Sequence, residues 1–285
     1  MIITVIGLGL IGGSFAKTLK NHHSNIHVIG SDIYQKHEKK ALELGLVDEC
    51  LPFENAISQA EIILLAVPVN IIEQQLKDIL DKIEPRQLVI DFGSTKHNIT
   101  ASVAGHRNRK NYLAAHPMAG TENTGPEAAF AGLYTNKILI ICDQEFTDNQ
   151  LLEKAISIFN LLSFQLIYMD SKSHDKHIAY VSHLSHVSSF MLGLTVLDIE
   201  QDEKNIFHMA GSGFQSTVRL AMSSADMWTP IFIQNKSNVK KALSQYITQL
   251  KEFEEALDQE DEQMLHQMMS RANNIKKALD KKQQL

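Results

Sequence analysis

Cysteine is scarce in this sequence, with two residues in 285, Cys50 and Cys142. They lie far apart, form no CxxC or Cys/His pattern of the kind that binds zinc, and follow no secretory signal. Disulfide frameworks occur mainly in oxidising compartments. We therefore expect two buried thiols, and neither a disulfide-stabilised fold nor a zinc site.

Long apolar runs and an excess of basic residues are also missing. The longest uninterrupted apolar run is IILLAVPV at 62–69, far below the roughly 20 residues that span a bilayer. The chain has 27 basic and 33 acidic residues, a net charge of −6 without long charged blocks, which gives no electrostatic footprint for nucleic acid or membrane. These absences indicate a cytoplasmic protein whose partners are small molecules and further copies of itself.

Apolar residues make up 44% of the sequence, enough for a large core. In the first 168 residues, short runs of Val, Ile and Leu alternate with stretches of helical periodicity, such as the expected crossover helix at 68–86. Runs without strict polar alternation are typical of strands buried on both faces, and hence of a mostly parallel sheet covered by helices. The expected strands are 2–7, 26–32, 61–67, 87–93, 112–117, 137–142 and 164–169.

The strand pattern ends near residue 169, and the rest of the chain has helical periodicity. The segment 174–199 carries few charges, while 237–258 and 264–279 each place apolar residues on one face. One small domain cannot bury so much apolar surface, which predicts a homodimer formed through this half. The predicted fold class is α/β, with a sheet domain at 1–168 followed by an all-helical dimerisation domain at 169–285.

A glycine-rich turn, GLGLIGGS at 7–14, directly follows the first expected strand and opens a helix expected from about residue 11. It matches G-x-G-x-x-G, in which the glycines allow a tight turn, close approach of the backbone to a pyrophosphate, and close packing of helix on strand. Amides at the helix N-terminus then face the anion. The motif predicts a Rossmann domain that binds a dinucleotide. The residues expected to line the cofactor here are Gly7, Leu8, Gly9, Leu10, Ile11 and Gly12.

An acidic residue, Asp32, ends the second expected strand, 20 residues after Gly12. Such a side chain accepts hydrogen bonds from the adenine-ribose hydroxyls and repels a 2′-phosphate, so the sequence favours NAD over NADP. Ligands of open α/β sheets bind outside the carboxyl ends of the strands. Val67 and Pro68, which end a later strand, are therefore also expected beside the cofactor.

Two polar residues, Ser94 and His116, are expected at this same edge of the sheet. His116 ends the strand YLAAHP, and its imidazole, with an unperturbed pKa near 6.5, suits a general base. A histidine there can equally be a loop residue that binds a backbone carbonyl, and Ser94 can simply cap the helix that follows. The sequence leaves these alternatives open.

Four histidines, His174, His177, His183 and His186, lie in one expected helix. The pairs 174/177 and 183/186 each share a face, but they are about 13 Å apart along the axis. Zinc–nitrogen bonds of about 2.1 Å cannot bridge that distance. No metal site is predicted, and we expect these imidazoles to form hydrogen bonds at the mouth of the cleft.

An arginine, Arg219, lies between a pair of glycines and the only tryptophan, Trp228. In apolar surroundings an arginine either pairs with a structural carboxylate or binds an anionic ligand, and its planar guanidinium suits a carboxylate. Spacing alone does not decide between these.

The distinctive segments, in order, are GLGLIGGS, Asp32, DFGSTK (91–96), HPMAGTE (116–122), VSHLSH (181–186) and GSGFQSTVR (211–219). In them the chain resembles the prephenate dehydrogenase family of tyrosine biosynthesis, over essentially its whole length. The resemblance implies a Rossmann domain followed by a helical dimerisation domain. It also implies oxidative decarboxylation of prephenate to 4-hydroxyphenylpyruvate with NAD.

The resemblance further implies that His116 is the catalytic histidine and Ser94 its supporting serine. The residues that it places near the substrate are His186, His183, the carboxylate-binding Arg219, and Trp228, the last reaching in from the partner subunit. The chain departs from the family pattern at Ser216, where relatives often have an acidic residue. This departure puts a gating ion pair to Arg219 in doubt.

Other functions stay open. Arogenate differs from prephenate only in having an amino acid in place of the keto acid, so an arogenate dehydrogenase is an alternative. A β-hydroxyacid-type dehydrogenase shares the two-domain plan but uses a lysine base on the first helix of its second domain, where this chain has AYVSHLSHVSSF at 179–190. An NAD-sensing module would bind cofactor without turnover, and His116, Ser94 and Arg219 together argue against it.

Overall fold

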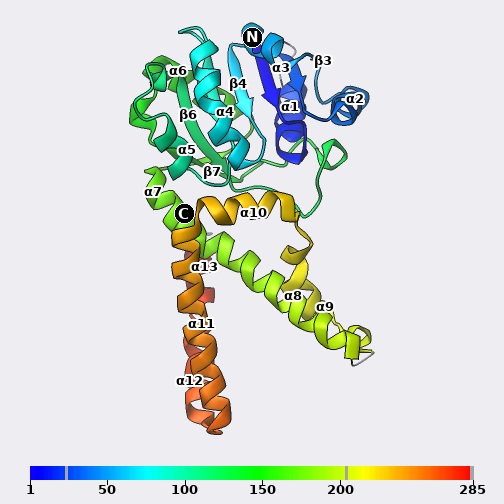
Figure 1. Ribbon diagram of the computed structural model, residues 1–285, viewed down its shortest axis with the longest axis vertical. Helices are drawn as coiled ribbons and strands as arrows, with labels where there is room; N and C mark the ends of the chain where they lie inside the picture. The colour runs from blue at the N-terminus through cyan, green and yellow to red at the C-terminus, as the bar shows by residue number, and fades with distance from the viewer. Residues whose placement is uncertain (23–24, 203–204, 283–285) are drawn as a thin grey trace. The chain divides into compact units, whose positions relative to one another are not determined.

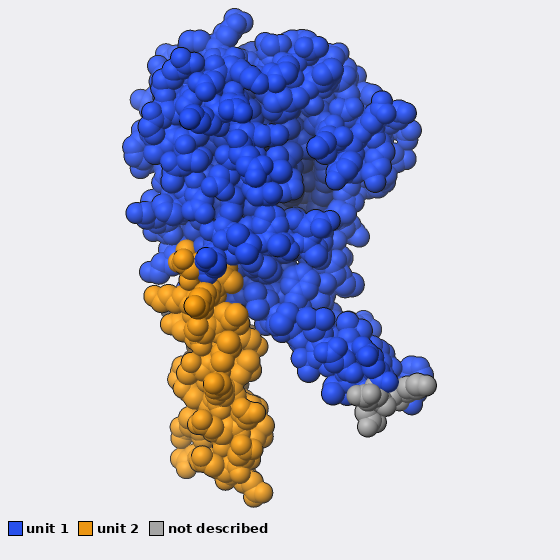
Figure 2. Space-filling view, in the orientation of Figure 1, with its two compact units in different colours: residues 1–236 blue, residues 237–285 orange. Residues whose placement is uncertain are grey.

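The computed structural model describes residues 1–22, 25–202 and 205–282. The chain divides into two compact units, Met1–Lys236 and Ser237–Leu285, which Figure 2 shows in different colours. Unit 1 contains the whole sheet together with the first helices that follow residue 169. The domain boundary expected at 168/169 lies inside unit 1 and stays a prediction.

Eight strands of unit 1 form one sheet in the order β3-β2-β1-β4-β5-β6-β7-β8 (Figure 1). Neighbouring strands pair in parallel except β6 and β7, which are antiparallel. All seven predicted strands are present, and β3 is an addition of two residues, too short to be marked by an apolar run. The strands are β1 (Ile2–Ile6), β2 (His27–Ser31), β3 (Glu49–Cys50), β4 (Ile62–Leu65), β5 (Leu88–Asp91), β6 (Tyr112–Pro117), β7 (Ile138–Cys142) and β8 (Gln165–Met169).

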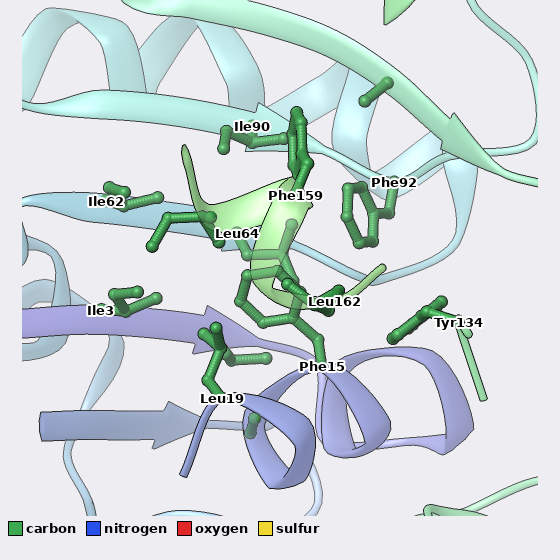
Figure 3. Close-up of a cluster of buried hydrophobic side chains, with 14 of the residues drawn as sticks. Ile3, Phe15, Leu19, Ile62, Leu64, Ile90, Phe92, Tyr134, Phe159 and Leu162 are labelled. Carbon is green, nitrogen blue, oxygen red and sulfur yellow. The ribbon is translucent and has the colours of Figure 1, made fainter. Parts of the chain in front are cut away.

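Helices cover both faces of the sheet, which explains why the central strands are apolar on both sides. Helices α1, α2 and α6 contribute to the hydrophobic cluster on one face, where Phe15 of α1 and Phe159 of α6 meet side chains of β1, β4 and β5 (Figure 3). Helices α3, α4 and α5 contribute to the cluster on the other face. These helices are α1 (Leu10–His22), α2 (Gln35–Glu43), α3 (Phe53–Gln59), α4 (Val69–Lys82), α5 (His97–Ser102) and α6 (Asn149–Leu161).

The strand order reverses between β1 and β4: the chain adds β2 and β3 on one side of β1 and the later strands on the other. Ligands of doubly wound sheets bind at this reversal, outside the carboxyl ends of the strands. Because β1, β4, β5 and β6 run parallel, the turns that follow them share one edge. That edge holds the candidate site.

After β8, unit 1 continues as a series of helices. Between α7 and α8 lies a π-helical turn, Ala179–His183, a rare conformation that is frequent at functional sites. The helices are α7 (Ser171–Ile178), α8 (Leu184–Asp202), α9 (Ser212–Val218) and α10 (Ala225–Gln234). Large apolar side chains exposed on α8 are Met191, Leu192, Leu194, Leu197 and Ile199.

Unit 2 is helical. It contains most of α11 (Lys236–Asp258), then α12 (Glu262–Ala272) and α13 (Ile275–Lys282). Its exposed large apolar side chains are Ile247, Leu250, Phe253, Leu257, Met264, Met269, Ile275 and Leu279. Across both units, none of the described helices is long and apolar enough to cross a membrane.

Both cysteines are free thiols. Cys142 on β7 is buried as predicted, whereas Cys50 on β3 is only half-buried. Burial raises the pKa of both thiols, that of Cys50 to about 11. Neither is a thiolate at neutral pH, so neither is poised to act as a nucleophile.

Candidate active site at the carboxyl edge of the sheet

The glycine-rich turn joins β1 to α1, which begins at Leu10, one residue before its predicted start. Gly7 has a φ of +93°, and a Cβ there would lie 2.5 Å from the carbonyl oxygen of Ala66. A Cβ at Gly12 would overlap the carbonyl oxygen of Gly7. At Gly9, by contrast, none of the described residues beyond its chain neighbours comes within 4 Å of a Cβ. The turn is thus tightly packed at Gly7 and Gly12 and open at Gly9, which fits a pyrophosphate approaching the amides of α1.

Asp32, just after β2, is held beside this turn. Its Oδ2 accepts a hydrogen bond from the amide of Leu8 at 2.8 Å. Its Oδ1 accepts from the amide of Tyr34 at 2.9 Å and from Nδ1 of His37 at 3.2 Å. These bonds fix the carboxylate at the end of β2, where an adenine ribose presents its hydroxyls in this fold.

Val67 and Pro68 form the turn after β4, next to the glycine-rich turn. The Cγ1 atom of Val67 lies so close to Gly7 that a Cβ on Gly7 would approach it to 2.8 Å. Pro68 precedes α4 directly and is exposed. On the other side of the turn, the carbonyl of Ile11 accepts a hydrogen bond from the Tyr134 hydroxyl at 2.6 Å, which anchors the first turn of α1.

A chain of hydrogen bonds starts at His116, near the end of β6. Nδ1 of His116 lies 2.8 Å from Nε2 of His174 on α7, and Nδ1 of His174 lies 2.8 Å from Oδ1 of Asp175. A carboxylate only accepts, so His174 carries its proton on Nδ1 and accepts with Nε2. His116 must then donate from Nδ1. Its Nε2 is left with a free lone pair, which is the atom that a general base needs.

The pKa shifts agree with this arrangement. Burial lowers the pKa of His116 well below 6.5, and His174, Lys96 and His183 lower it further. Burial also lowers the pKa of His174, against the opposing effect of Asp175. Burial alone would raise the pKa of Asp175, but hydrogen bonds from His174 and from two backbone amides keep it below 3.8. At neutral pH the chain therefore consists of one carboxylate and two neutral imidazoles.

Asp175 also binds the start of α5, which follows the Ser94 segment. Its Oδ1 accepts from the amide of Lys96 at 2.8 Å and its Oδ2 from the amide of His97 at 3.0 Å. The alternative in which Ser94 caps α5 is therefore wrong, because the residue before the helix is Lys96 and the cap comes from Asp175. Ser94 is half-buried, and within the described part of the chain its hydroxyl has no hydrogen-bond partner.

His183, His186 and Trp228 form a second group. Rings of His186 and Trp228 are stacked with centroids 3.5 Å apart, and His183 meets Trp228 edge-on at 5.7 Å. Nε2 of His183 and Nε1 of Trp228 are buried without a partner among the described residues. Burial lowers the pKa of His183 to about 4 and also lowers that of His186. Trp228 thus lies beside His186 within one chain, and its contribution across a subunit interface stays a prediction.

Arg219 is exposed and pairs with a carboxylate that the sequence did not indicate. Its Nη1 lies 3.3 Å from Oε2 of Glu122, in the loop that follows β6. Arg219 thus has an ion-pair partner although residue 216 is not acidic, because the partner comes from another segment. The backbone around Arg219 is held by the buried Ser189 of α8, whose hydroxyl donates to the Thr217 carbonyl and accepts from the Ala221 amide, both at 3.0 Å.

Sequence reasoning missed Asp175, Glu122 and Lys96, and assigned no specific partner to His174. Each lies next to or inside a segment that was already singled out: Asp175 follows His174, Glu122 ends HPMAGTE and Lys96 ends DFGSTK. Their partners were not readable, because the contacts join residues 58, 79 and 97 positions apart. The other histidines of the segment 174–186 lie apart from His116: His183 and His186 pack against Trp228, and His177 is exposed.

Comparisons with known proteins cover nearly the whole chain. The family model described as prephenate dehydrogenase, nucleotide-binding domain, matches residues 15–168, and the one described as prephenate dehydrogenase, dimerization domain, matches residues 170–271. The prephenate dehydrogenase of Lactococcus lactis is 28% identical over 281 residues, 98% of this chain and 77% of the relative. The cyclohexadienyl dehydrogenase of Zymomonas mobilis is 27% identical over 285 residues, 97% of this chain and 95% of the relative.

Two solved structures are similar to nearly the whole chain. Prephenate dehydrogenase from Aquifex aeolicus, in complex with hydroxyphenyl propionate and NAD+, superposes with a TM-score of 0.86 at 28% identity, covering 98% of both chains. Synechocystis arogenate dehydrogenase superposes with a TM-score of 0.75 at 26% identity, covering 98% of this chain and 100% of that one.

Proposed function

This chain belongs to the prephenate dehydrogenase family, and from that premise we propose that it converts prephenate to 4-hydroxyphenylpyruvate and carbon dioxide with NAD. It is an NAD-dependent dehydrogenase with a Rossmann-type nucleotide-binding domain. The observation that carries the proposal is the chain from Asp175 through His174 to His116, which leaves a free imidazole lone pair at the cofactor edge of the sheet.

The reaction needs a base for one proton. NAD, when bound, accepts the hydride from the hydroxyl-bearing ring carbon of prephenate. His116 takes the hydroxyl proton on Nε2, and the resulting imidazolium is stabilised through His174 by Asp175. Loss of carbon dioxide then leaves its electron pair in the ring, which becomes aromatic, and the ring oxygen recovers the proton from His116. Ser94 is free to orient the substrate hydroxyl or His116.

The other predicted residues divide into cofactor and substrate contacts. The glycine-rich turn and the amides of α1 would hold the pyrophosphate of NAD, and Asp32 would bind the adenine ribose. Val67 and Pro68 would form the adjoining wall of the cofactor site. Prephenate has two carboxylates, and Arg219 binds one of them through its planar guanidinium. His186, His183 and Trp228 form the remaining substrate wall, and the stacking of His186 on Trp228 supports this grouping.

A homodimer is part of the proposal. The family model matched to residues 170–271 is described as a dimerization domain. Exposed apolar side chains on α8 in unit 1, and on α11 and α12 in unit 2, give each unit surface that a second copy can bury. Light scattering should therefore report a dimer at micromolar concentration, and a monomer would contradict this part of the proposal.

The test is replacement of His116 with asparagine, which keeps a hydrogen-bonding side chain but removes the base. We expect kcat with prephenate to fall by about 10²–10⁴ while NAD affinity is unchanged. His177→Asn is the matched control, because His177 is exposed on the same α7 that carries His174, and it should behave as wild type.

Substrate choice is measured in the same assay, by comparing prephenate with arogenate, each with NAD and with NADP. Preference for prephenate with NAD supports the proposal. Turnover of arogenate alone would replace prephenate as the substrate and leave the role of His116 intact. A His116→Asn variant that keeps more than about a third of wild-type kcat, well outside the range for a lost general base, would show that His116 only anchors its loop.

A further inference from the structure

Lys96 is a fully buried lysine, with no exposed side-chain surface. Its ammonium group forms an ion pair with Asp91 at the end of β5 and donates a hydrogen bond to the carbonyl of Ala115 at 2.8 Å. Asp91 in turn accepts hydrogen bonds from the hydroxyl of Tyr112 and the amide of Gly93. Each charged group of this buried cluster therefore has at least two hydrogen-bond partners.

The cluster closes a ring of contacts around His116. The side chain of Lys96 holds the carbonyl of Ala115, the residue directly before His116. The backbone amide of Lys96 binds Oδ1 of Asp175, the same oxygen that accepts from His174. His174 completes the ring by accepting from His116. His116 is thus fixed from two sides. The Lys96 side chain binds the backbone directly before it, and His174 binds its ring; Asp175, which holds His174, also accepts from the Lys96 amide.

A contribution to stability does not explain why the Lys96–Asp91 ion pair is buried. Moving two charges out of water costs several kcal/mol per ion, and replacing a buried ion pair by well-packed apolar residues is often neutral or stabilising. A buried hydrogen-bonded network does, however, hold its members in one geometry. Misplacement of a reacting group by about 1 Å can cost 10²-fold in rate, so the value of the pair lies in placing His116.

We propose that Lys96 is a positioning residue for the dehydrogenase reaction, holding the backbone at Ala115 and the α5 start so that His116 presents Nε2 to the substrate. This inference rests on the function proposed above. It assigns Lys96 no contact with substrate or cofactor.

Lys96 also acts on the charge state of His116. The titratable groups that act on the pKa of His116 are His174 from α7, Lys96 before α5 and His183 from the π-helical turn. The carboxylates of Asp91 and Asp175 bind Lys96 and His174, the neighbours of His116. After burial and His174, the Lys96 ammonium is the next cause that lowers the pKa of His116. Lys96 therefore favours the neutral imidazole that can accept a proton.

The test uses paired substitutions, so that no buried charge is left alone. In Lys96→Met with Asp91→Asn, the amide oxygen at 91 still accepts from Gly93 and the amide nitrogen can donate to the Tyr112 hydroxyl. The variant loses the bond to Ala115 and both charges of the ion pair, so neither charge is left unpaired. In Lys96→Gln with Asp91→Asn, the side chain at 96 keeps an N–H donor for that carbonyl. Lys154→Met with Glu61→Gln is the matched control, because it removes a partly exposed ion pair with N···O of 2.8 Å.

For the Met variant we expect kcat with prephenate to fall about 10- to 100-fold, with KM and the NAD Kd within about threefold of wild type. The acid limb of kcat/KM should move to higher pH. The variant removes both charges, but only that of Lys96 is among the causes that lower the pKa of His116. The Gln variant should show the same shift of the limb with a smaller loss of kcat. The control should match wild type in both.

A Met variant with wild-type kcat and an unmoved acid limb, differing only in a lower Tm, would make Lys96 an ordinary core residue and overturn the inference. Equal losses of kcat in the Met and Gln variants would also overturn it, since positioning requires the donor to Ala115. If the Met variant does not fold, the Gln variant decides alone: wild-type kcat with an unmoved limb refutes the inference, and a lower kcat at unchanged KM with a shifted limb supports it. Wild-type protein inactive on both prephenate and arogenate would instead overturn the proposed function.

Discussion

The substitution Asp175→Asn should prevent His116 from acting as a base, although Asp175 contacts His116 only through His174. The carboxylate of Asp175 accepts from three donors, His174 Nδ1 and the amides of Lys96 and His97. An asparagine has one acceptor oxygen and one NH₂ group. If the oxygen stays on the side of His174 and Lys96, the NH₂ opposes the His97 amide. If the amide flips, the NH₂ faces both His174, whose Nδ1 must then accept, and the Lys96 amide, which loses its acceptor.

The flipped arrangement reverses the whole chain of tautomers. His174 would carry its proton on Nε2 and donate to Nδ1 of His116, so His116 would carry its own proton on Nε2 and could no longer act as a base. Where an aspartate contacts the catalytic histidine directly, this change costs about 10⁴ in kcat. Asp175 acts through one intervening imidazole, so we expect a loss of about 10²–10³, or about 3–4 kcal/mol of transition-state stabilisation. The lost cap of α5 should also lower the free energy of unfolding by about 1–3 kcal/mol.

Steady-state NADH formation with prephenate measures the effect, and calorimetric NAD binding checks that the fold is intact. Asp170→Asn is the matched control, because Asp170 caps α7 by accepting from the Ser173 amide at 2.9 Å and asparagine is an equally good N-cap. It should keep wild-type kcat. If Asp175→Asn keeps kcat within about threefold of wild type, far from the loss expected for a wrong tautomer, Asp175 serves only as a cap and the tautomer assignment is wrong.

Three further results are expected. Asp32→Ala should weaken NAD binding and relax discrimination against NADP, because the repulsion of a 2′-phosphate disappears; a wild type that already prefers NADP would refute this role. Arg219→Lys should raise KM for prephenate about tenfold or more with little change in NAD binding, since an ammonium cannot reproduce the guanidinium fork on a carboxylate; an unchanged KM would leave Arg219 with only its contact to Glu122. Burial lowers the pKa of His183 from 6.5 to about 4 in the folded protein, so between these pH values the unfolded state binds one more proton than the folded state. The free energy of unfolding, measured with urea, should therefore decrease as pH drops below about 6.5, by at most about 3 kcal/mol from this group. A free energy of unfolding that is constant across that window would contradict the buried placement of His183.

Local patterns were sufficient for the sheet and the nucleotide-binding turn. Strands of a parallel sheet are buried on both faces, so each appears as an uninterrupted apolar run, and the run at 61–67 contains β4 (Ile62–Leu65) with little error. The glycine turn is equally local, because the positive φ of Gly7 and the crowding at Gly12 concern neighbouring backbone. β3 escaped detection because two residues form no run.

The candidate site was predictable only as a set of residue types at one edge. Parallel strands bring their carboxyl ends together, so Ser94 and His116 could be placed in one region from sequence order. The sequence left open whether His116 was a base or a loop anchor, since the two differ in the partner of a single nitrogen. That partner, His174, is 58 residues away.

What the sequence by itself determined is the family, the doubly wound sheet and the cofactor turn, because each depends on periodicity or on motifs within a short stretch of chain. The tertiary structure alone decided which side chains meet: His174 with His116, Asp175 with the start of α5, Glu122 with Arg219, and Lys96 with the carbonyl of Ala115. These contacts depend on how α7 packs against α5 and on the order of strands in the sheet. Hydrogen bonds act over about 3 Å, and such distances between residues far apart in sequence are set only when the whole core is packed.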